Sequence, residues 1–223
     1  MELVAARKEG RTLDLTAPAG HSHSAMLFDL IGSALDGAGM TIRDLELIGV
    51  GIGPGSFTGI RIALSTARML AQVLDRPLVG AHSTLFYAAS CGVPAGGQVL
   101  VAFDAKKGRV FGALYEMAGP GELPRAIVEP GDYGIEALAG RAAANCACIG
   151  DGAARHGEEL SRILPGHRLI EPPVPSGEAA LDIVEALHRA NGGALAGYEH
   201  VLPFYARKSD AEVLLELKKR EQG

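Results

Sequence analysis

The chain contains no tryptophan, few aromatic residues and no surplus of positive charge. Aromatic residues occupy 5% of its 223 positions, and 21 Lys and Arg stand against 26 Asp and Glu, so the formal net charge is -5. This balance argues against a protein that binds nucleic acid through its overall field, because phosphate contacts need an excess of lysine and arginine. The net charge does not exclude a local basic patch. The hydrophobic content of 48% excludes a wholly disordered chain.

Cysteines and long apolar runs are also scarce. The three cysteines form no CxxC pair, which favours neither a disulfide framework nor a zinc site, and free thiols fit a reducing cytoplasm. The charged stretch 1–11 has no apolar core of signal-peptide length. No apolar run reaches the roughly 20 residues that a membrane helix needs. We therefore expect a cytoplasmic protein without membrane contact.

The order of the predicted elements indicates an α/β protein in two lobes, divided near residue 97. In lobe 1–97, alternation predicts a hairpin over 3–15, and helical spacing predicts a helix over 24–36. A strand–loop–helix–strand order follows over 45–81 and predicts a parallel βαβ unit. Lobe 98–223 is expected to contain strands and helices, ending in a charged helix or tail: strands 99–104, 109–116, 147–149 and 168–170, helices 135–144, 153–163 and 178–189, and the tail 210–221.

Glycine is abundant, with 30 residues, and its densest cluster lies between the predicted strand and helix of the βαβ unit. Such a loop can direct backbone N–H groups at a phosphate. It fails the Walker pattern, which needs lysine where Ile60 stands, and the dinucleotide fingerprint, which needs glycine where Ser56 stands. A tight turn is the favoured interpretation and a phosphate loop the alternative, with these candidate residues: Gly53, Gly55, Ser56, Thr58 and Gly59.

The helix over 59–74 is apolar around most of its circumference. Its polar residues are confined to one narrow stripe, whereas a surface helix of a monomer needs only one apolar face. In the helix over 24–36, Phe28 points away from the main apolar face. The spare apolar surface indicates a partner protein, and coverage by other parts of this chain is an equal alternative. The candidate interface residues are Met26, Phe28, Ile31, Leu35, Ile60, Leu64, Ala67 and Ala71.

No catalytic or metal-binding constellation can be recognised. The histidines lack HExxH-type spacing, and His21 and His23 have no obvious third ligand. Asp104 ends a predicted strand, where a turn-forming aspartate is the favoured interpretation and a catalytic one the alternative. The basic cluster that follows is interpreted as a solvated hairpin tip, made of Lys106, Lys107 and Arg109.

Residues 53–61, GPGSFTGIR, resemble the signature of the TsaB family, and further similar segments follow in order along nearly the whole chain. They are the His23–Ser24 helix start, PLVG at 77–80, DAKKGRVF at 104–111, IGDGA at 149–153 and PFYARKSDAE at 203–212. This family is the non-catalytic subunit in bacterial synthesis of the threonylcarbamoyladenosine modification of tRNA.

The resemblance implies a two-lobe fold like that of the actin, hexokinase and Hsp70 ATPases, which is ribonuclease H-like. It implies a subunit required for threonylcarbamoylation of adenosine 37 in ANN-decoding tRNAs, which binds and activates the catalytic TsaD subunit through first-lobe helices. A TsaE-like ATPase joins the complex, tRNA is met only through the complex, and the subunit alone forms a homodimer. No metal or cofactor is implied, and nucleotide binding is expected of the complex rather than of this chain.

Two departures from the family pattern stand out. The usual opening strand, close to LAIDTS, is missing ahead of the first predicted hairpin, and with it the acidic turn that nucleotide-binding members of this superfamily use. Lys106 and Arg109 replace the arginine and glutamate that are usual in the later hairpin. Two other functions remain as alternatives: a nucleotide-binding phosphotransferase of the same superfamily, and a glycoprotease-like peptidase, against which the absence of a two-histidine helix argues.

Overall fold

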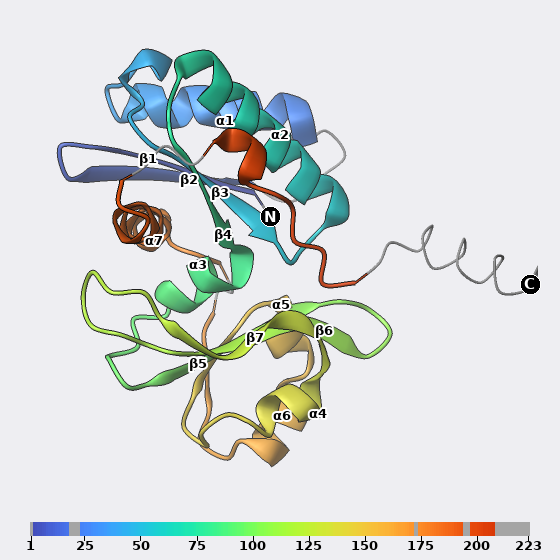
Figure 1. The fold of residues 1–223 in the computed structure, drawn as a ribbon. Coiled ribbons are helices and arrows are strands. Elements are labelled where there is room, and N and C mark those ends of the chain that lie inside the picture. Colours follow the sequence, from blue (N-terminus) through green and yellow to red (C-terminus); the bar gives the residue numbers. More distant parts are fainter. Residues whose placement is uncertain (1, 18–22, 172–173, 194–196, 208–223) are drawn as a thin grey trace, which may run out of the picture.

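The structure is a computed structural model that describes residues 2–17, 23–171, 174–193 and 197–207 in two lobes (Figure 1). In the N-terminal lobe, β1 and β2 form an antiparallel hairpin, and β3 and β4 form a parallel pair. Among the described residues these are two separate two-stranded sheets. The elements of this lobe are β1 (Glu2–Lys8), β2 (Arg11–Ala17), α1 (His23–Gly37), the 3-10 helix Ile42–Asp44, β3 (Ile48–Gly53), α2 (Phe57–Leu74) and β4 (Leu78–His82).

The predicted βαβ unit is confirmed, and its local chemistry explains its bounds. Ser56 caps α2, because its hydroxyl accepts a hydrogen bond from the amide of Gly59 at 3.3 Å. The helix ends at Asp75, whose φ of 51° is left-handed. The β3–β4 pair then packs Val50 and Leu78 against the inner side of α2 in one apolar core.

The C-terminal lobe is built on one five-stranded mixed sheet with the order β7-β6-β5-β8-β9. Strand β5 alternates, so that Leu100 and Ala102 join a core with α4, α5 and α6, while Val99 and Val101 face the side of α3. The elements of this lobe, with α3 at its junction to the other, are α3 (Ser83–Ala89), β5 (Gln98–Asp104), β6 (Arg109–Glu116), β7 (Arg125–Gly134), α4 (Ile135–Ala139), β8 (Ala147–Ile149), α5 (Asp151–Arg155), α6 (Gly157–Ile163) and β9 (Arg168–Leu169).

Several expectations need correction. Strand β7 was not predicted, because Pro130, Gly131 and Gly134 interrupt its pattern; it is an edge strand, where such residues are tolerated. The predicted helix 135–144 ends at Ala139, and the predicted helix 153–163 is two short helices that meet at His156. The predicted tail 210–221 lies outside the described residues.

The chain also returns to the N-terminal lobe near its end, which the predicted division at residue 97 did not include. Helix α7 (Gly177–Ala190) packs on β1 and β2, and the 3-10 helix Tyr198–His200 packs on α2. The contact with β3 is close: a Cβ at Gly49 would collide with Val184 of α7. The N-terminal lobe is therefore built from two stretches of sequence. Helix α7 packs on β1 in space, although all five strands of the C-terminal sheet lie between them in the sequence.

Candidate functional site

The glycine turn between β3 and α2 is closed by the C-terminal segment of the chain. Gly53 has a φ of 113°, and a side chain there would collide with the backbone carbonyl of Phe204. The Phe204 amide donates to the Ile52 carbonyl at 2.8 Å, so the two backbones are joined at this point. The turn therefore needs glycine at 53 for a close approach within the protein.

The other predicted phosphate-loop residues lie together on the same turn. Ser56 is occupied as the α2 cap, whereas Gly55 and Thr58 face open space or solvent. Because Gly53 and Ser56 already have structural roles, the geometry supports the tight-turn interpretation of this loop. Phosphate binding there stays a prediction.

An aromatic and cationic cluster lies at the start of α2. The Arg61 guanidinium lies 3.8 Å from the centre of the Phe57 ring and donates from Nε to the Tyr205 hydroxyl at 2.9 Å. The Phe57 and Tyr205 rings are 4.6 Å apart. Sequence reasoning missed this cluster, because 144 positions separate Arg61 from Tyr205.

His82, at the end of β4, contacts the same closing segment. Its ring meets Phe204 edge-on at 4.6 Å, and its Nδ1 lies 3.3 Å from the Gly53 carbonyl oxygen. Burial lowers the pKa of His82, so the folded protein favours the neutral ring.

Most of the predicted interface residues are buried inside this chain, which corrects the sequence prediction. Five of them are no more than 7% exposed: Leu35, Ile60, Leu64, Ala67 and Ala71. The four on α2 recur at the spacing of one helix face, and Leu64, Ala67 and Ala71 join the β3–β4 core. That face is covered by the chain's own sheet, which is the alternative that the sequence left open.

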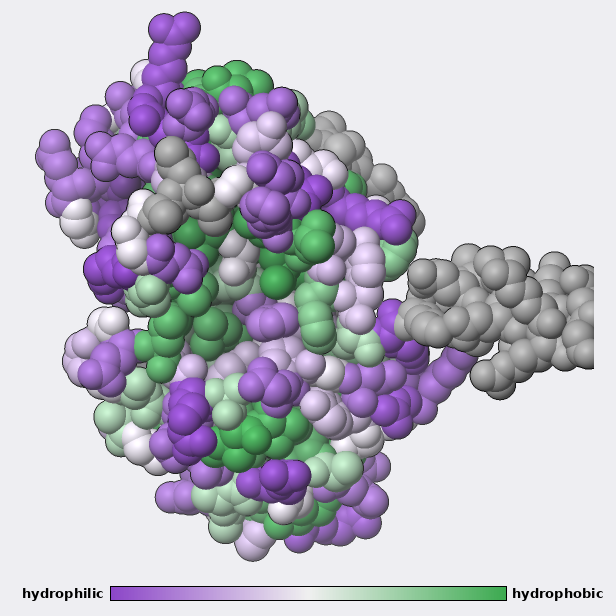
Figure 2. Space-filling model, viewed as in Figure 1, coloured by the Kyte–Doolittle hydropathy of each residue, from purple (hydrophilic) through white to green (hydrophobic). Residues whose placement is uncertain are grey.

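The remaining predicted residues belong to α1. Phe28 is 49% exposed, Ile31 is half-buried against the core beneath α1, and the side chain of Met26 lies outside what the structure describes. On α2, Met69 and Val73 are 43% and 76% exposed, one turn apart and opposite the buried face. Figure 1 shows α1 and α2 side by side on the same face of the lobe, and Figure 2 shows hydrophobic residues over the upper end of α2. We call Phe28, Met69 and Val73 the helical patch; the helical period could have found its α2 part.

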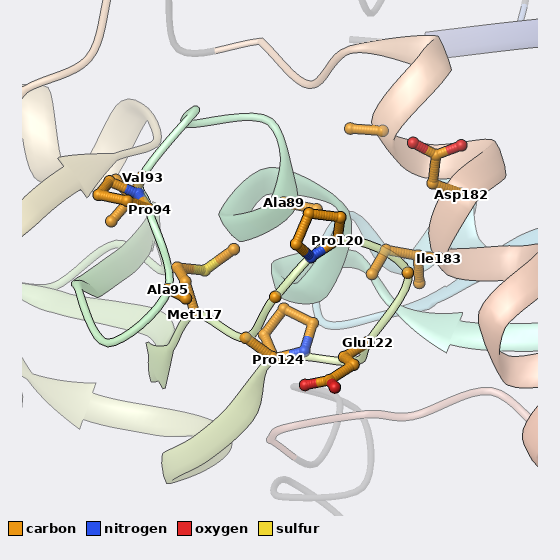
Figure 3. Close-up of a pocket in the computed structure, with 14 residues that line it drawn as sticks. Ala89, Val93, Pro94, Ala95, Met117, Pro120, Glu122, Pro124, Asp182 and Ile183 are labelled. Carbon is orange, nitrogen blue, oxygen red and sulfur yellow. The ribbon is translucent and has the colours of Figure 1, made fainter.

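A further cavity, of about 280 Å³, lies where α7 meets the loops that precede β5 and follow β6. Figure 3 shows Pro120, Pro124 and Ile183 between the carboxylates of Glu122 and Asp182. Asp182 already accepts a hydrogen bond from the Arg7 guanidinium at 2.7 Å. Its volume lies at the lower end of typical ligand pockets, which are roughly 300–1,000 Å³.

Asp104, the candidate catalytic aspartate, and Asp151, in the IGDGA segment, both serve turns. Asp104 accepts from the Lys106 amide at 2.9 Å, and Asp151 accepts from the amides of Asp104 and Gly152 at 3.0 Å each. Within the described part of the chain there is no group of three side chains able to hold a metal ion, and no helix long and apolar enough to span a membrane.

A family model described as TsaD, tRNA N6-adenosine threonylcarbamoyltransferase, matches residues 17–128. The TsaB protein of Bacillus subtilis is 38% identical over 95 residues, covering 43% of this chain and 41% of the relative. The TsaB protein of Escherichia coli is 30% identical over 113 residues, 48% of this chain and 49% of the relative.

The chain belongs to the TsaB/YeaZ family. YeaZ from Pseudomonas aeruginosa superposes with a TM-score of 0.73 and 26% identity, over 91% of this chain and 93% of that one. The protein therefore has the mixed α/β fold of the YeaZ structures, which belong to the actin-like ATPase fold. The sequence matches span about half the length of the TsaB relatives, whereas the structural match spans nearly all of YeaZ.

Proposed function

We propose that this protein is an accessory, non-catalytic subunit in the threonylcarbamoylation of adenosine 37 in ANN-decoding tRNAs, and that it binds and activates a TsaD-like catalytic subunit. The observation that carries this proposal is the helical patch on the face shared by α1 and α2, in a member of the TsaB/YeaZ family. Large apolar side chains exposed together on one face are typical of protein interfaces.

The helical patch offers the energy that an interface needs without weakening the fold. Fully burying one Met, Val or Phe side chain contributes about 1.5–3 kcal/mol. Three such side chains supply a hydrophobic centre, around which the exposed Thr58, Ser65 and Gln72 of α2 form a polar rim. In the absence of the catalytic subunit, the same patch on a second copy would form a homodimer, and a TsaE-like ATPase would join the heteromeric complex.

The described residues support an accessory role rather than a chemical one. Asp104 and Asp151 both accept hydrogen bonds from turn amides, and Asp104 also pairs with the Lys106 ammonium. The glycine turn has structural roles of its own. We therefore assign the chemistry and any nucleotide binding to the complex.

We also propose that the N-terminal sheet is one strand short of the family pattern. The support is that β1 pairs only with β2, and β3 only with β4, among the described residues, although α7 packs on both pairs. One more strand between two such pairs would join them into a continuous sheet.

The test is the double substitution Met69→Asp and Val73→Asp, read out by co-purification with a TsaD-like subunit and by threonylcarbamoylation of a tRNA transcript in a reconstituted reaction. Since 1.4 kcal/mol is a factor of ten in affinity, losing two buried apolar contacts should weaken the complex by at least about 100-fold. Substitutions at exposed sites usually change the free energy of unfolding by no more than about 0.5 kcal/mol, so the isolated variant should stay folded.

The matched control is Leu202→Asp, which also places a charge at an exposed apolar residue, 63% accessible, that is not part of the helical patch. It should leave both the complex and the reaction intact. Undiminished co-purification and activity of the double variant would refute the helical patch as the interface.

A further inference from the structure

Cations from three distant parts of the sequence gather at the tip of the β5–β6 hairpin. Lys106 and Lys107 form the turn itself, with left-handed φ angles of 63° and 54°, and the Lys106 side chain is 77% exposed. Arg155 comes from α5 and lies 3.6 Å from the Asp104 carboxylate that Lys106 also contacts. The cationic surface at the hairpin tip thus continues onto α5.

The C-terminal segment adds a fourth cation to the same surface. Arg207 donates to the Ala105 carbonyl at 3.2 Å, and its guanidinium lies 5.5 Å from the centre of the Phe111 ring. Arg109, on the other side of the tip, donates to Asp132 at 2.7 Å. We call this set the basic strip: Lys106, Lys107, Arg109, Arg155 and Arg207.

The carboxylates of this region lie mostly beneath the cations. The side chains of Asp104 and Asp132 are 8% and 14% exposed, whereas those of Arg155 and Arg109 are 67% and 45% exposed. The hydrogen bond from the Lys106 ammonium lowers the pKa of Asp104, which keeps that carboxylate ionised and its cations fixed. Asp151 has its Oδ1 occupied by two backbone amides. Asp151 is itself exposed, so five cations stand against three carboxylates here, a local positive excess in a chain whose formal net charge is -5.

The basic strip continues into the aromatic cluster at the start of α2. Tyr205 is two residues before Arg207, and its ring is 37% exposed beside Phe57, also 37% exposed. The Arg61 guanidinium lies over the Phe57 ring and donates to the Tyr205 hydroxyl, which adds a positive charge to this aromatic pair. Figure 2 shows hydrophilic residues gathered over the hairpin end at the right of the view. Cations followed by exposed aromatic rings can bind a phosphate backbone and stack on unpaired bases.

We propose that this subunit contacts tRNA directly, with the basic strip on the phosphate backbone and the Phe57–Tyr205 pair beside it. The proposal rests on the proposed function, which supplies tRNA as the nucleic acid. An acidic protein surface would match the cations but would leave the exposed aromatic pair without a role. The resemblance implied that tRNA is met only through the complex, and the formal net charge of -5 argued against binding through the chain's overall field.

The experiment measures binding of an unmodified tRNA transcript to the isolated full-length chain between 50 and 200 mM salt, by fluorescence anisotropy. The variant combines Lys106→Gln, Lys107→Gln and Arg155→Gln. Each phosphate contact contributes about 0.7–0.9 to the slope of log K against log salt. The variant should therefore lower that slope by about two and weaken binding at 50 mM salt at least tenfold.

The control removes three exposed cations that lie outside the basic strip and have no ion pair among the described residues: Arg43→Gln, Arg141→Gln and Arg189→Gln. The control changes the net charge by the same amount, so it should cause only the small loss of tRNA affinity that comes from long-range electrostatics. Equal behaviour of the two variants, or no saturable binding by the parent chain at 50 mM salt, would overturn the proposal. Circular dichroism of both variants shows whether either has simply failed to fold.

The same samples separate this proposal from the proposed function. A chain that co-purifies with a TsaD-like subunit but binds no tRNA contradicts the basic strip alone. A chain that binds tRNA through the strip but recruits no TsaD-like subunit contradicts the proposed function instead.

Discussion

Replacing Leu64 by alanine tests which side of α2 the protein buries in itself. Leu64 is 3% exposed and packs with Val50, Leu78, Ala67 and Ala71 between the helix and the β3–β4 pair. Removing a buried leucine in this way costs the transfer energy of the lost methyl groups and leaves a cavity, together about 3–5 kcal/mol. A folded domain has only about 5–15 kcal/mol in total, so the effect is large.

The assay is unfolding of the isolated protein by urea and by heat, followed by circular dichroism. For a chain of this size, a loss of 3–5 kcal/mol lowers the melting temperature by roughly 6–20 °C. The control is Met69→Ala on the same helix, 43% exposed, which should cost less than about 1 kcal/mol. If Leu64→Ala costs no more than Met69→Ala, then the inner face of α2 is not in a packed core, and the reassignment of the interface to the helical patch is wrong.

Three further predictions concern buried groups. Burial lowers the pKa of His82, so the unfolded chain protonates this ring more readily than the folded protein does. The free energy of unfolding should therefore fall as pH drops from about 7 toward 5.5, and His82→Gln should reduce that pH dependence in urea titrations. Gly150→Ala should lower the urea midpoint of unfolding more than Gly121→Ala. Both glycines have a positive φ, at which an alanine backbone is strained by about 1–3 kcal/mol, but only at Gly150 would the added Cβ also collide with a backbone carbonyl, that of Ala102. The buried cysteines should resist maleimide at pH 8 until urea unfolds the chain, since none of the three is more than 7% exposed. Burial raises the pKa of Cys91 to about 12, and the hydrogen bond with Cys146, together with burial, raises that of Cys148; rapid labelling of the native protein would contradict this burial.

The helical patch and the basic strip show where reasoning from the sequence stops. The sequence alone shows Lys106, Lys107 and Arg109 as a small basic cluster, and it shows Phe28 pointing away from the main apolar face of its helix. Arg155 contacts Asp104, 51 positions earlier, and Arg207 contacts Ala105, 102 positions earlier; both contacts form only in the folded chain. No periodic pattern links such positions. The C-terminal segment also closes the glycine turn, so the close approach at Gly53 depends on a residue 151 positions later, Phe204.

The sequence by itself determined the α/β class, the βαβ unit with its capped helix, most strand and helix positions and the family, because these depend on short-range periodicity, turn chemistry and motifs a few residues long. Tertiary structure alone decided which face of α2 is core and which is free. An amphipathic pattern reports that Ile60, Leu64, Ala67 and Ala71 must be buried, but not by what. That answer came from where β3 and β4 lie beneath the helix, and it leaves Met69 and Val73 on the surface for a partner.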